Sequence, residues 1–465
     1  MKIKFIGAAK EVTGSKHLME VNGKKIFLDF GMFQGKREES NRKNRQMDFN
    51  AAKIDAVILS HAHIDHSGNL PILSKAGFKG PIYSTHATRD LCAHMLLDSG
   101  MIQENEIEYL NKRLAKKGKP PAQPLYTAED ARNVIQQFVG MSYDHPFEVA
   151  PGVIVSFREA GHILGSAQVI MIIDDKDDGK QKIVVFTGDL GRKKMPLLKD
   201  PFQLERADVL ITESTYGNRF HRDVIDIPEQ LEKVVNGTCK KGGKIIIPAF
   251  ALERTQEIIY NLNLLFKAKR IPDVPIFVDS PLAVNLTGIF TAHPECLDEE
   301  TWQTFLKDQK NPFGFGSIKY ITDVEDSKAL NEYRGPCIII SAAGMCEHGR
   351  ILHHLKNNVE DPKNTILIVG YMAKETLGRK LMEKHPVVKI FGEPYKLNAT
   401  VIVMDAFSAH ADRSDLLDYV GQIRGLNKIF LVHGEEDQQV MFKNILIEEG
   451  HKDVTIPGPG EEYSF

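Results

Sequence analysis

The sequence of 465 residues has few cysteines, no long apolar run and almost no net charge. Its five cysteines are scattered and form no C-x-x-C pair, which argues against a disulfide framework and against cysteine as a metal ligand. No apolar run reaches membrane-spanning length, and the N-terminus lacks the apolar core of a signal peptide. We therefore expect a reduced, cytoplasmic protein that has no membrane partner.

The balance of charge limits what the protein can bind through its overall electrostatic field. Its 59 Lys and Arg residues against 62 Asp and Glu residues give a formal net charge of -3. A nucleic-acid-binding protein with this balance needs a local basic cleft. The basic run KRLAKKGK at 112–119 could face RNA, but we interpret it as a solvated helix end.

Short apolar runs that end abruptly in a polar residue recur along the chain. Such runs are typical of buried strands, and open α/β folds place their sites at one edge of a sheet, just past the strand ends. Seven such endings predict one site assembled from distant parts of the sequence. The seven polar residues are Asp29, His61, His162, Asp189, Glu213, His410 and His433.

Three other patterns predict the organisation of the chain. Asn22-Gly23 lies between two apolar runs and predicts a hairpin turn. Residues 90–145 have the apolar spacing of two helices. From about 208 to 395, strands alternate with helices, which predicts a parallel sheet with crossover helices. The length and these changes of pattern favour more than one domain.

The run HAHIDH holds four candidate metal ligands in six residues. In an extended loop His61 and His63 point the same way, so they can bind one ion together. Asp65 and His66 lie beyond the turn and can reach a second ion. Imidazole and carboxylate groups suit zinc, so we predict a zinc site rather than a polar surface loop.

Two metal ions need more ligands than this loop offers. Asp189 in TGDL has two carboxylate oxygens and is a candidate to bridge the ions, while His162 could complete the first site and His433 the second. Singly, each residue could equally be a turn residue, a core histidine or a strand-end cap. Together with the HAHIDH loop, they favour a site for two zinc ions per chain.

The early motifs of the chain resemble those of a known superfamily. LDFG at Asp29, HAHIDH at 61–66, GH at His162 and TGDL at Asp189 are similar to the successive motifs of the metallo-β-lactamase superfamily. They occur in the order of that superfamily. The resemblance implies an αββα sandwich that carries the metal site.

The later motifs narrow the resemblance to the β-CASP ribonucleases. TESTYGNR with Glu213, FSAHAD with His410 and LVHGEED with His433 resemble motifs A, B and C of that family. SAAGM at 341–345 and GYMAKETLGR at 370–379 are similar to the same group. The family includes the endonuclease subunit of the cleavage and polyadenylation specificity factor and its bacterial and archaeal homologues. The resemblance covers essentially the whole chain.

The resemblance implies an α/β architecture of two domains. A metallo-β-lactamase αββα sandwich would comprise residues 1–207 and 396–465, with an inserted β-CASP α/β domain at 208–395. Family members that cut DNA usually lack a histidine at motif C, so His433 favours single-stranded RNA as the partner. Endonuclease and 5′-to-3′ exonuclease modes stay open, as does a homodimer.

The implied reaction is hydrolysis of an RNA phosphodiester bond by a hydroxide held between two zinc ions that Asp189 bridges. Asp65 would bind the second ion and could accept the proton of the attacking water. Asp29 would hydrogen-bond a ligand histidine and fix its tautomer. His410 would protonate the leaving oxygen, with Glu213 holding it protonated. Structural roles for Glu213 and His410, such as a cap or a loop contact, are the alternative.

Further residues are candidates to hold phosphate groups of the RNA. SAAGM offers Ser341 and Gly344, near which backbone N–H groups could approach a phosphate, and Arg379 could pair with one. Arg254 and Arg350 are more typical of solvated helix residues. The alternatives in function are a DNA nuclease, a metallo-β-lactamase-type hydrolase of esters or thioesters, and a non-catalytic RNA-processing subunit.

Overall fold

The computed structural model describes residues 1–35, 37–221, 227–308, 311–370, 372–373, 376–404 and 407–465. Tyr371, Lys374 and Glu375 of the GYMAKETLGR segment, and residues 405–406 before FSAHAD, lie outside these ranges. The chain forms two compact units. The first unit comprises 1–193, 200–220 and 410–465, and the second comprises 194–199 and 221–409.

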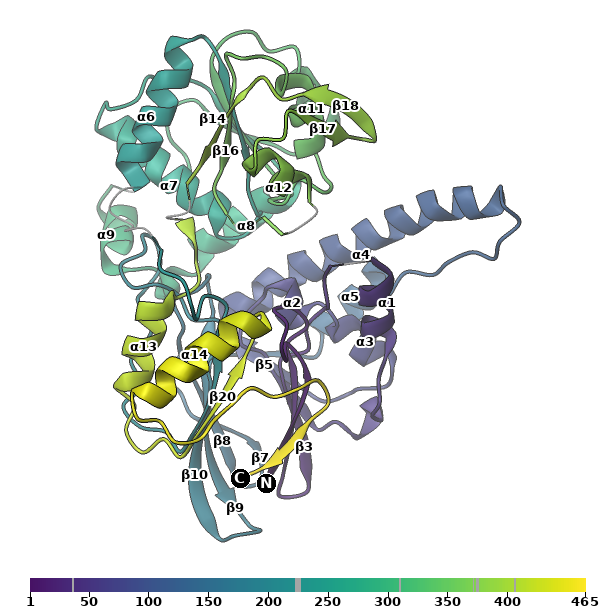
Figure 1. Ribbon diagram of the computed structural model, residues 1–465, viewed down its shortest axis with the longest axis vertical. Helices are drawn as coiled ribbons and strands as arrows, with labels where there is room; N and C mark the ends of the chain where they lie inside the picture. Colours follow the sequence, from purple (N-terminus) through teal and green to yellow (C-terminus); the bar gives the residue numbers. More distant parts are fainter. Residues whose placement is uncertain (36, 222–226, 309–310, 371, 374–375, 405–406) are drawn as a thin grey trace. The chain divides into compact units, whose positions relative to one another are not determined.

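The first unit contains two seven-stranded sheets, each with both parallel and antiparallel neighbours (Figure 1). Sheet 1 has the order β22-β1-β2-β3-β4-β5-β6. Its strands are β1 Lys2–Gly7, β2 Lys16–Val21, β3 Lys24–Leu28, β4 Ala56–Ile58, β5 Ile82–Thr85, β6 Phe138–Met141 and β22 Glu462–Ser464. Sheet 2 has the order β21-β20-β11-β10-β9-β8-β7. Its strands are β7 Phe147–Ala150, β8 Val153–Glu159, β9 Ala167–Asp175, β10 Lys180–Phe186, β11 Val209–Glu213, β20 Lys428–Val432 and β21 Val454–Thr455.

The main core of the first unit lies between sheets 1 and 2. Phe5 and Met19 of sheet 1 and Phe157 and Phe186 of sheet 2 belong to one fully buried apolar cluster. Strand residues alternate between the two faces of a sheet, so each strand contributes every second side chain to this core. The close packing of these faces fixes the positions of the strand ends that carry the candidate site.

Helices cover the outer faces of both sheets, which gives the predicted αββα sandwich. Leu416 and Val420 of one helix and Phe442 and Leu446 of another pack on sheet 2 in a second apolar cluster. The helices of this unit are α1 Arg37–Arg45, η1 Ala51–Lys53, α2 Ile64–Ser67, α3 Leu70–Lys75, α4 His86–Ala115, α5 Ala128–Ile135, α13 Arg413–Gly421 and α14 Glu436–Glu448.

The hairpin and the two helices predicted from the sequence are confirmed. β2 and β3 pair antiparallel, and Asn22 and Gly23 between them both have positive φ values, 51° and 77°. A two-residue hairpin turn of this type requires positive φ at both positions, and Asn-Gly favours it. Helices α4 and α5 occupy the segment in which the apolar residues have helical spacing.

The second unit contains sheet 3, a parallel six-stranded sheet of order β14-β13-β15-β12-β16-β19. The predicted parallel sheet with crossover helices is confirmed. The strands are β12 Lys244–Pro248, β13 Ile276–Asp279, β14 Ile318–Ile321, β15 Cys337–Ser341, β16 Thr365–Ile368 and β19 Thr400–Val403, beside a two-stranded sheet of β17 Val387–Ile390 and β18 Glu393–Lys396. The helices are α6 Ile227–Lys240, α7 Arg254–Lys267, α8 Pro281–Ala292, η3 Pro294–Cys296, α9 Glu299–Asp308, α10 Val324–Ala329, α11 Ile351–Asn358 and α12 Leu377–Met382.

The compact units differ from the expected domain bounds of 208 and 395 at both junctions. β11 pairs in parallel with β10 and β20, so it belongs to sheet 2 of the first unit. β19 pairs in parallel with β16, so it belongs to sheet 3 of the second unit. Strand pairing between segments far apart in sequence sets these bounds, and a local change of pattern does not reveal it.

No helix among the described residues is long and apolar enough to cross a membrane. All five cysteines are free thiols. Burial raises the pKa of the Cys92 and Cys337 thiols to about 12, so both stay protonated and unreactive at neutral pH.

Candidate metal centre

The candidate site of the first unit lies where strand ends of two sheets meet. Asp29 and His61 follow β3 and β4 of sheet 1, whereas Asp189 and His433 follow β10 and β20 of sheet 2. The expectation that all the endings line one edge of one sheet was therefore wrong. A hydrogen bond from Ala167 N to Ser60 O joins the two sheets directly beside the HAHIDH loop.

The first group of donors consists of His61, His63, His162 and Asp189. The Nδ1 atom of His63 lies 3.2 Å from Nε2 of His61 and 3.2 Å from Nε2 of His162. The Oδ2 atom of Asp189 lies 3.5 Å from each of the same two Nε2 atoms. Ligand atoms at 2.0–2.1 Å from a tetrahedral zinc ion lie about 3.3 to 3.4 Å from one another, so these donors fit zinc.

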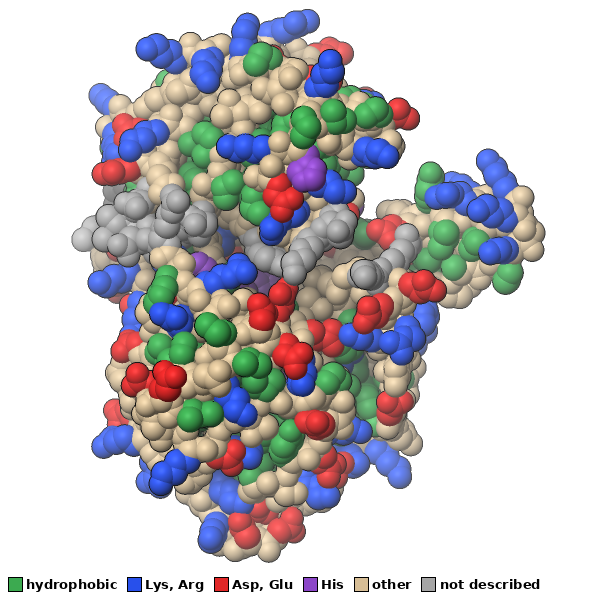
Figure 2. Space-filling view, viewed as in Figure 1, with side chains coloured by type: hydrophobic (Ala, Val, Ile, Leu, Met, Phe, Trp, Pro, Cys, Tyr) green, Lys and Arg blue, Asp and Glu red, His purple; other side chains and the backbone are tan. Residues whose placement is uncertain are grey.

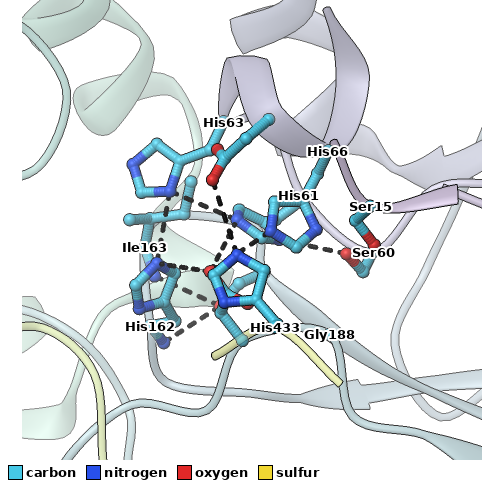
Figure 3. A network of polar contacts seen from close by, with 12 residues as sticks. Ser15, Ser60, His61, His63, His66, His162, Ile163, Gly188 and His433 are labelled. Atoms are coloured by element: carbon cyan, nitrogen blue, oxygen red, sulfur yellow. Dashed lines mark hydrogen bonds and ion pairs between the residues drawn. The ribbon is translucent and has the colours of Figure 1, made fainter. Parts of the chain in front are cut away.

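The second group of donors consists of Asp65, His66 and His433. The Nε2 atom of His433 lies 3.4 Å from Oδ2 of Asp65. The Nε2 atom of His66 lies 3.3 Å from Oδ2 of Asp189, the same oxygen that faces the first group. Figure 3 shows the rings of both groups converging on this region. One carboxylate oxygen thus faces both groups of donors.

Three buried polar atoms where the two groups meet make no hydrogen bond. They are Nε2 of His66, Nε2 of His433 and Oδ1 of Asp189. Burying such atoms without a partner costs free energy, about 1–3 kcal/mol each, unless something else satisfies them. A metal ion is a suitable partner because a deprotonated imidazole nitrogen and a carboxylate oxygen each offer it a lone pair.

Two glycines allow the Asp189 loop to approach the other loops closely. A Cβ atom on Gly188 would lie 2.6 Å from Cβ of Ser60, and φ at Gly188 is +54°. A Cβ atom on Gly191 would lie 1.7 Å from the carbonyl oxygen of Gly161, next to His162. The sequence TGDLG therefore places Asp189 between two close contacts that only glycine permits.

Asp29 contacts His66, one of the candidate ligands. Its Oδ2 atom lies 2.6 Å from Nδ1 of His66, which leaves Nε2 of that ring to face Asp189. The hydroxyl groups of Ser15 and Ser60 also donate to Oδ2 of Asp29, at 3.1 and 3.0 Å. Sequence reasoning missed both serines, although Ser60 directly precedes the HAHIDH motif.

Thr215 is a third supporting residue that sequence reasoning missed. Its Oγ1 atom lies 3.0 Å from Nδ1 of His433 and thereby leaves Nε2 of His433 directed to Asp65. Thr215 belongs to the TESTYGNR motif, but that motif by itself does not predict a contact with His433. Contacts of this kind orient a ligand ring and fix its tautomer.

Burial and charge set the protonation of the cluster. Burial lowers the pKa of His61 well below its ordinary value and lowers that of His63 to about 4, so both rings offer a lone pair at neutral pH. Burial opposes ionisation of Asp189, but the interactions with His433 and His66 outweigh it and lower the pKa of this carboxyl group. Burial likewise opposes the charged form of His66, but Asp189 and Asp29 outweigh it and raise the pKa of that ring well above its ordinary value, so zinc would have to displace a proton from His66. Neutral imidazoles and an ionised carboxylate are the forms that bind zinc.

His410 and Glu213 form a pair beside the donors. The Nδ1 atom of His410 lies 3.2 Å from both carboxylate oxygens of Glu213 and 3.9 Å from Oδ2 of Asp189. Glu213 is fully buried, and its Oε1 atom also accepts a 2.7 Å hydrogen bond from Leu190 N. Burial lowers the pKa of His410, but Glu213 outweighs this effect and raises the pKa to about 9. His410 is therefore protonated at neutral pH.

The candidate phosphate-binding residues lie in the second unit, where they have internal partners. The hydroxyl group of Ser341 donates to the carbonyl oxygen of Asp279 at 2.8 Å. The side chain of Arg379 pairs with Glu383, the residue that follows the last residue of α12. Gly344 packs against Phe250, whose ring would lie about 3 Å from an added Cβ atom. Because of these contacts, the hydroxyl group of Ser341, the guanidinium group of Arg379 and the backbone at Gly344 are less available to a phosphate.

Two arginines interpreted as solvated helix residues are in fact engaged in protein contacts. Arg350 donates to Oδ1 of the fully buried Asp279 at 2.6 Å, and Arg254 is almost fully buried and pairs with Glu257. The Arg350 pair joins residues 71 positions apart, which local sequence patterns do not reveal, whereas Arg254 and Glu257 lie three residues apart on α7. The basic run at 112–119 is exposed at the end of α4, as interpreted.

Replacing Asp29 with asparagine should weaken zinc binding about 10- to 100-fold, because the carboxylate that orients His66 is lost. Titration with a zinc-chelating dye measures this affinity. Asp55→Asn, which removes a carboxylate paired with Lys24 on the surface, is the control and should leave zinc affinity unchanged. Equal zinc affinity in Asp29→Asn and the wild-type protein would show that Asp29 does not support the metal site.

Three family descriptions match the chain. The metallo-beta-lactamase superfamily matches residues 14–219, the Beta-Casp domain matches 255–381, and the Zn-dependent metallo-hydrolase RNA specificity domain matches 394–457. The first match contains the HAHIDH loop, Asp189 and Glu213, and the last contains His410 and His433. The matches therefore include every residue of the two donor groups.

Similar proteins are known from bacteria and archaea. The chain is 35% identical to Ribonuclease TTHA0252 of Thermus thermophilus, over 99% of each chain. It is 33% identical to Transcription termination factor FttA of Methanosarcina mazei, over 94% of this chain and 67% of that protein. A crystal structure of a protein of unknown function from Enterococcus faecalis V583 has a similar fold, with a TM-score of 0.54, 14% identity and 99% coverage of both chains.

Proposed function

Because the chain belongs to the metallo-β-lactamase superfamily and, within it, to the β-CASP family, we propose that it is a zinc-dependent ribonuclease. One observation carries this proposal. Oδ2 of Asp189 lies 3.3–3.5 Å from ring nitrogens of two separate donor groups. The names of the relatives support RNA as the substrate, and we propose a role in RNA processing or decay.

The proposal includes two zinc ions per chain. His61, His63 and His162 would hold one ion, and Asp65, His66 and His433 the other, with Asp189 between them. Zinc supplies Lewis acid chemistry here, since it lowers the pKa of water and neutralises charge on the phosphate oxygens. Protein ligands that leave a coordination position open are typical of catalytic zinc.

The protein's own residues would position the reactants and move protons. Asp65 and Asp189 carry negative charge toward the centre of the cluster and can orient the attacking water or accept its proton. His410 stays protonated through its contact with Glu213 and can donate a proton to the leaving oxygen. Because Glu213 also accepts from Leu190 N, its carboxylate is fixed and keeps the His410 ring in place.

The remaining parts of the proposal concern domains, substrate contacts and location. We assign the metallo-β-lactamase domain to the first unit and the β-CASP domain to the second. Ser341, Gly344 and Arg379 are candidates for phosphate contacts.

A cytoplasmic location is supported by the free cysteines. A homodimer remains an expectation, which light scattering would test.

Labelled nucleic acids test the proposal directly. We expect the zinc-loaded protein to cut single-stranded RNA and to leave matched DNA essentially intact. Substrates labelled at the 5′ or the 3′ end separate endonuclease from 5′-to-3′ exonuclease products. Cutting of DNA alone would assign a DNA nuclease, and hydrolysis of thioesters without cutting of RNA would assign a small-molecule hydrolase. A zinc-loaded protein without any hydrolysis would be a non-catalytic subunit.

The pH dependence should reveal the pairing of His410 with Glu213. His410 works in its protonated form, and its pKa is raised to about 9, so the rate should be retained up to about pH 9 and fall above it. Glu213→Gln removes the negative charge that raises this pKa, so the alkaline fall should begin at lower pH. Profiles of kcat/KM against pH for both proteins measure the shift. Coincident alkaline limbs would contradict the pairing.

A further inference from the structure

Helix α4 has two halves with different surroundings. It runs for 30 residues, and its buried residues all lie between Ala87 and Gly100. From Met101 onward none of its residues is buried. A helix of this length extends about 45 Å, so its second half projects beyond the sheets of its own unit (Figure 1). We call residues 101–126, the projecting half and the returning segment, the α4 arm.

The α4 arm is held together by side-chain hydrogen bonds to the returning backbone. The amide group of Asn111 donates to Ala122 O at 3.0 Å and accepts from Ala122 N at 2.7 Å. Further along, Oε1 of Gln103 accepts from Leu125 N at 3.1 Å. Tyr126, at the end of the arm, is the one buried residue of 101–126, so side-chain hydrogen bonds rather than core packing hold the rest of the arm in place.

The tip of the α4 arm is strongly basic. Between Glu108 and Glu129 the sequence contains no acidic residue, although the whole chain carries a net charge of -3. Figure 2 shows basic side chains gathered at the end of the arm. The exposed cations of this stretch are Lys112, Arg113, Lys116, Lys117 and Lys119, of which Lys112 pairs with Glu108 at 2.8 Å. Such a local surplus of positive charge attracts a polyanion.

An exposed aromatic ring lies next to this charge. Tyr109 is 67% exposed, and it lies one helical turn before Arg113 on the same face. Together with Asn105, Glu106 and Leu110 these two residues line an open hollow on the helix. An exposed ring beside a guanidinium group offers a stacking platform for an unpaired base, and an amide offers hydrogen bonds to its edge.

We propose that the α4 arm is a second binding surface for single-stranded RNA, remote from the metal centre. Tyr109 stacks on a base, and the lysines of the tip pair with the flanking phosphates. This inference rests on the proposed function, because it concerns the same substrate. The hydroxyl groups of Thr85 and Thr88 donate to Gly165 O, in the loop that follows His162, so the base of α4 is fixed to the metal centre within one unit.

The proposal makes binding depend on RNA length. Because the whole of α4 is about 45 Å long, the tip of the arm lies about that far along the helix from its base, and a tetranucleotide bound at the metal centre is too short to reach it. A long single strand can contact both places at once. The gain in affinity from the arm then appears only with long RNA and is sensitive to salt, because phosphate contacts release counterions.

The test compares a tip variant with a matched control. The tip variant replaces Lys112, Lys116, Lys117 and Lys119 with glutamine, and Tyr109→Ala is made separately. The control replaces four other exposed lysines of the same unit, Lys53, Lys79, Lys176 and Lys180, with glutamine, so it loses the same number of positive charges. Affinity for labelled single-stranded RNA is measured by fluorescence anisotropy over a range of salt, in zinc-loaded protein that also carries His410→Ala to slow turnover. Rates for long RNA and a tetranucleotide are measured without that change.

We expect the tip variant to bind long RNA at least about tenfold more weakly, with a salt slope reduced by about 0.7 for each phosphate that the tip no longer neutralises. Tyr109→Ala should weaken binding without changing the slope, and the control should match the parent. Tetranucleotide cleavage should be the same in all four proteins. Unchanged affinity for RNA and an unchanged salt slope in the tip variant would overturn the proposal. A protein would then be the alternative binding partner of the arm. Absence of RNA cleavage by the wild-type protein would instead overturn the proposed function, whatever the affinities.

Discussion

Replacing Asp189 with asparagine should lower the rate of RNA hydrolysis about a thousandfold or more and should reduce the zinc content below two per chain. Asp189 offers the one oxygen that faces both donor groups, 3.3–3.5 Å from three ring nitrogens. Asparagine keeps the volume of the side chain but removes the negative charge that would balance the two proposed zinc ions. Loss of charge stabilisation of several kcal/mol accounts for a rate effect of this size.

The measurements for Asp189→Asn are zinc content by mass spectrometry and the rate on labelled RNA, with circular dichroism to check folding. Asp174→Asn makes the same change at an exposed carboxylate of β9 and should retain both zinc and activity. Loss of activity with full zinc content would show that Asp189 acts on the substrate rather than on the metal. Full activity and full zinc would exclude the shared-carboxylate site.

The clustering of the candidate ligands could be predicted from sequence because its signals are local and combine. HAHIDH holds four donors with a spacing that separates them into two pairs, and the geometry places His61 and His66 in different donor groups. Asp189 and His433 were recognisable because each directly follows an apolar strand. A polar residue just past the end of a buried strand has few structural roles, so its position indicates a functional site.

The side chains that hold the candidate ligands in place could not be predicted, because they lie far from the ligands in sequence and meet them only in the folded protein. The hydroxyl groups of Ser15 and Ser60 contact Asp29, but serines are common and their neighbours cannot be read from a sequence. For the same reason the sequence pattern around Arg350 is typical of a solvated residue, although its partner Asp279 lies fully buried 71 positions away. Pairings of distant strands likewise set the bounds of the two units.

The replacement His410→Ala should lower the rate on RNA about a hundredfold to ten-thousandfold while leaving the zinc content unchanged. His410 is outside the two main donor groups, and its Nδ1 atom faces Glu213. Its proposed task is to protonate the leaving oxygen, which in RNA is an alcohol and departs poorly as an anion. Removing the ring removes this proton but none of the proposed metal ligands.

A change of leaving group separates this role from a structural one. Nitrophenolate is stable as an anion, so hydrolysis of bis(p-nitrophenyl) phosphate needs no proton donor and should fall less than about tenfold in His410→Ala. Glu213→Gln keeps the ring and should give an intermediate loss on RNA, again with the nitrophenyl ester spared. If His410→Ala lowers the rates of hydrolysis of both substrates by the same factor, the ring supports the metal site or the fold. If only the rate on RNA falls and the zinc content is unchanged, His410 is the proton donor. Loss of metal would instead lower the rates on both substrates alike.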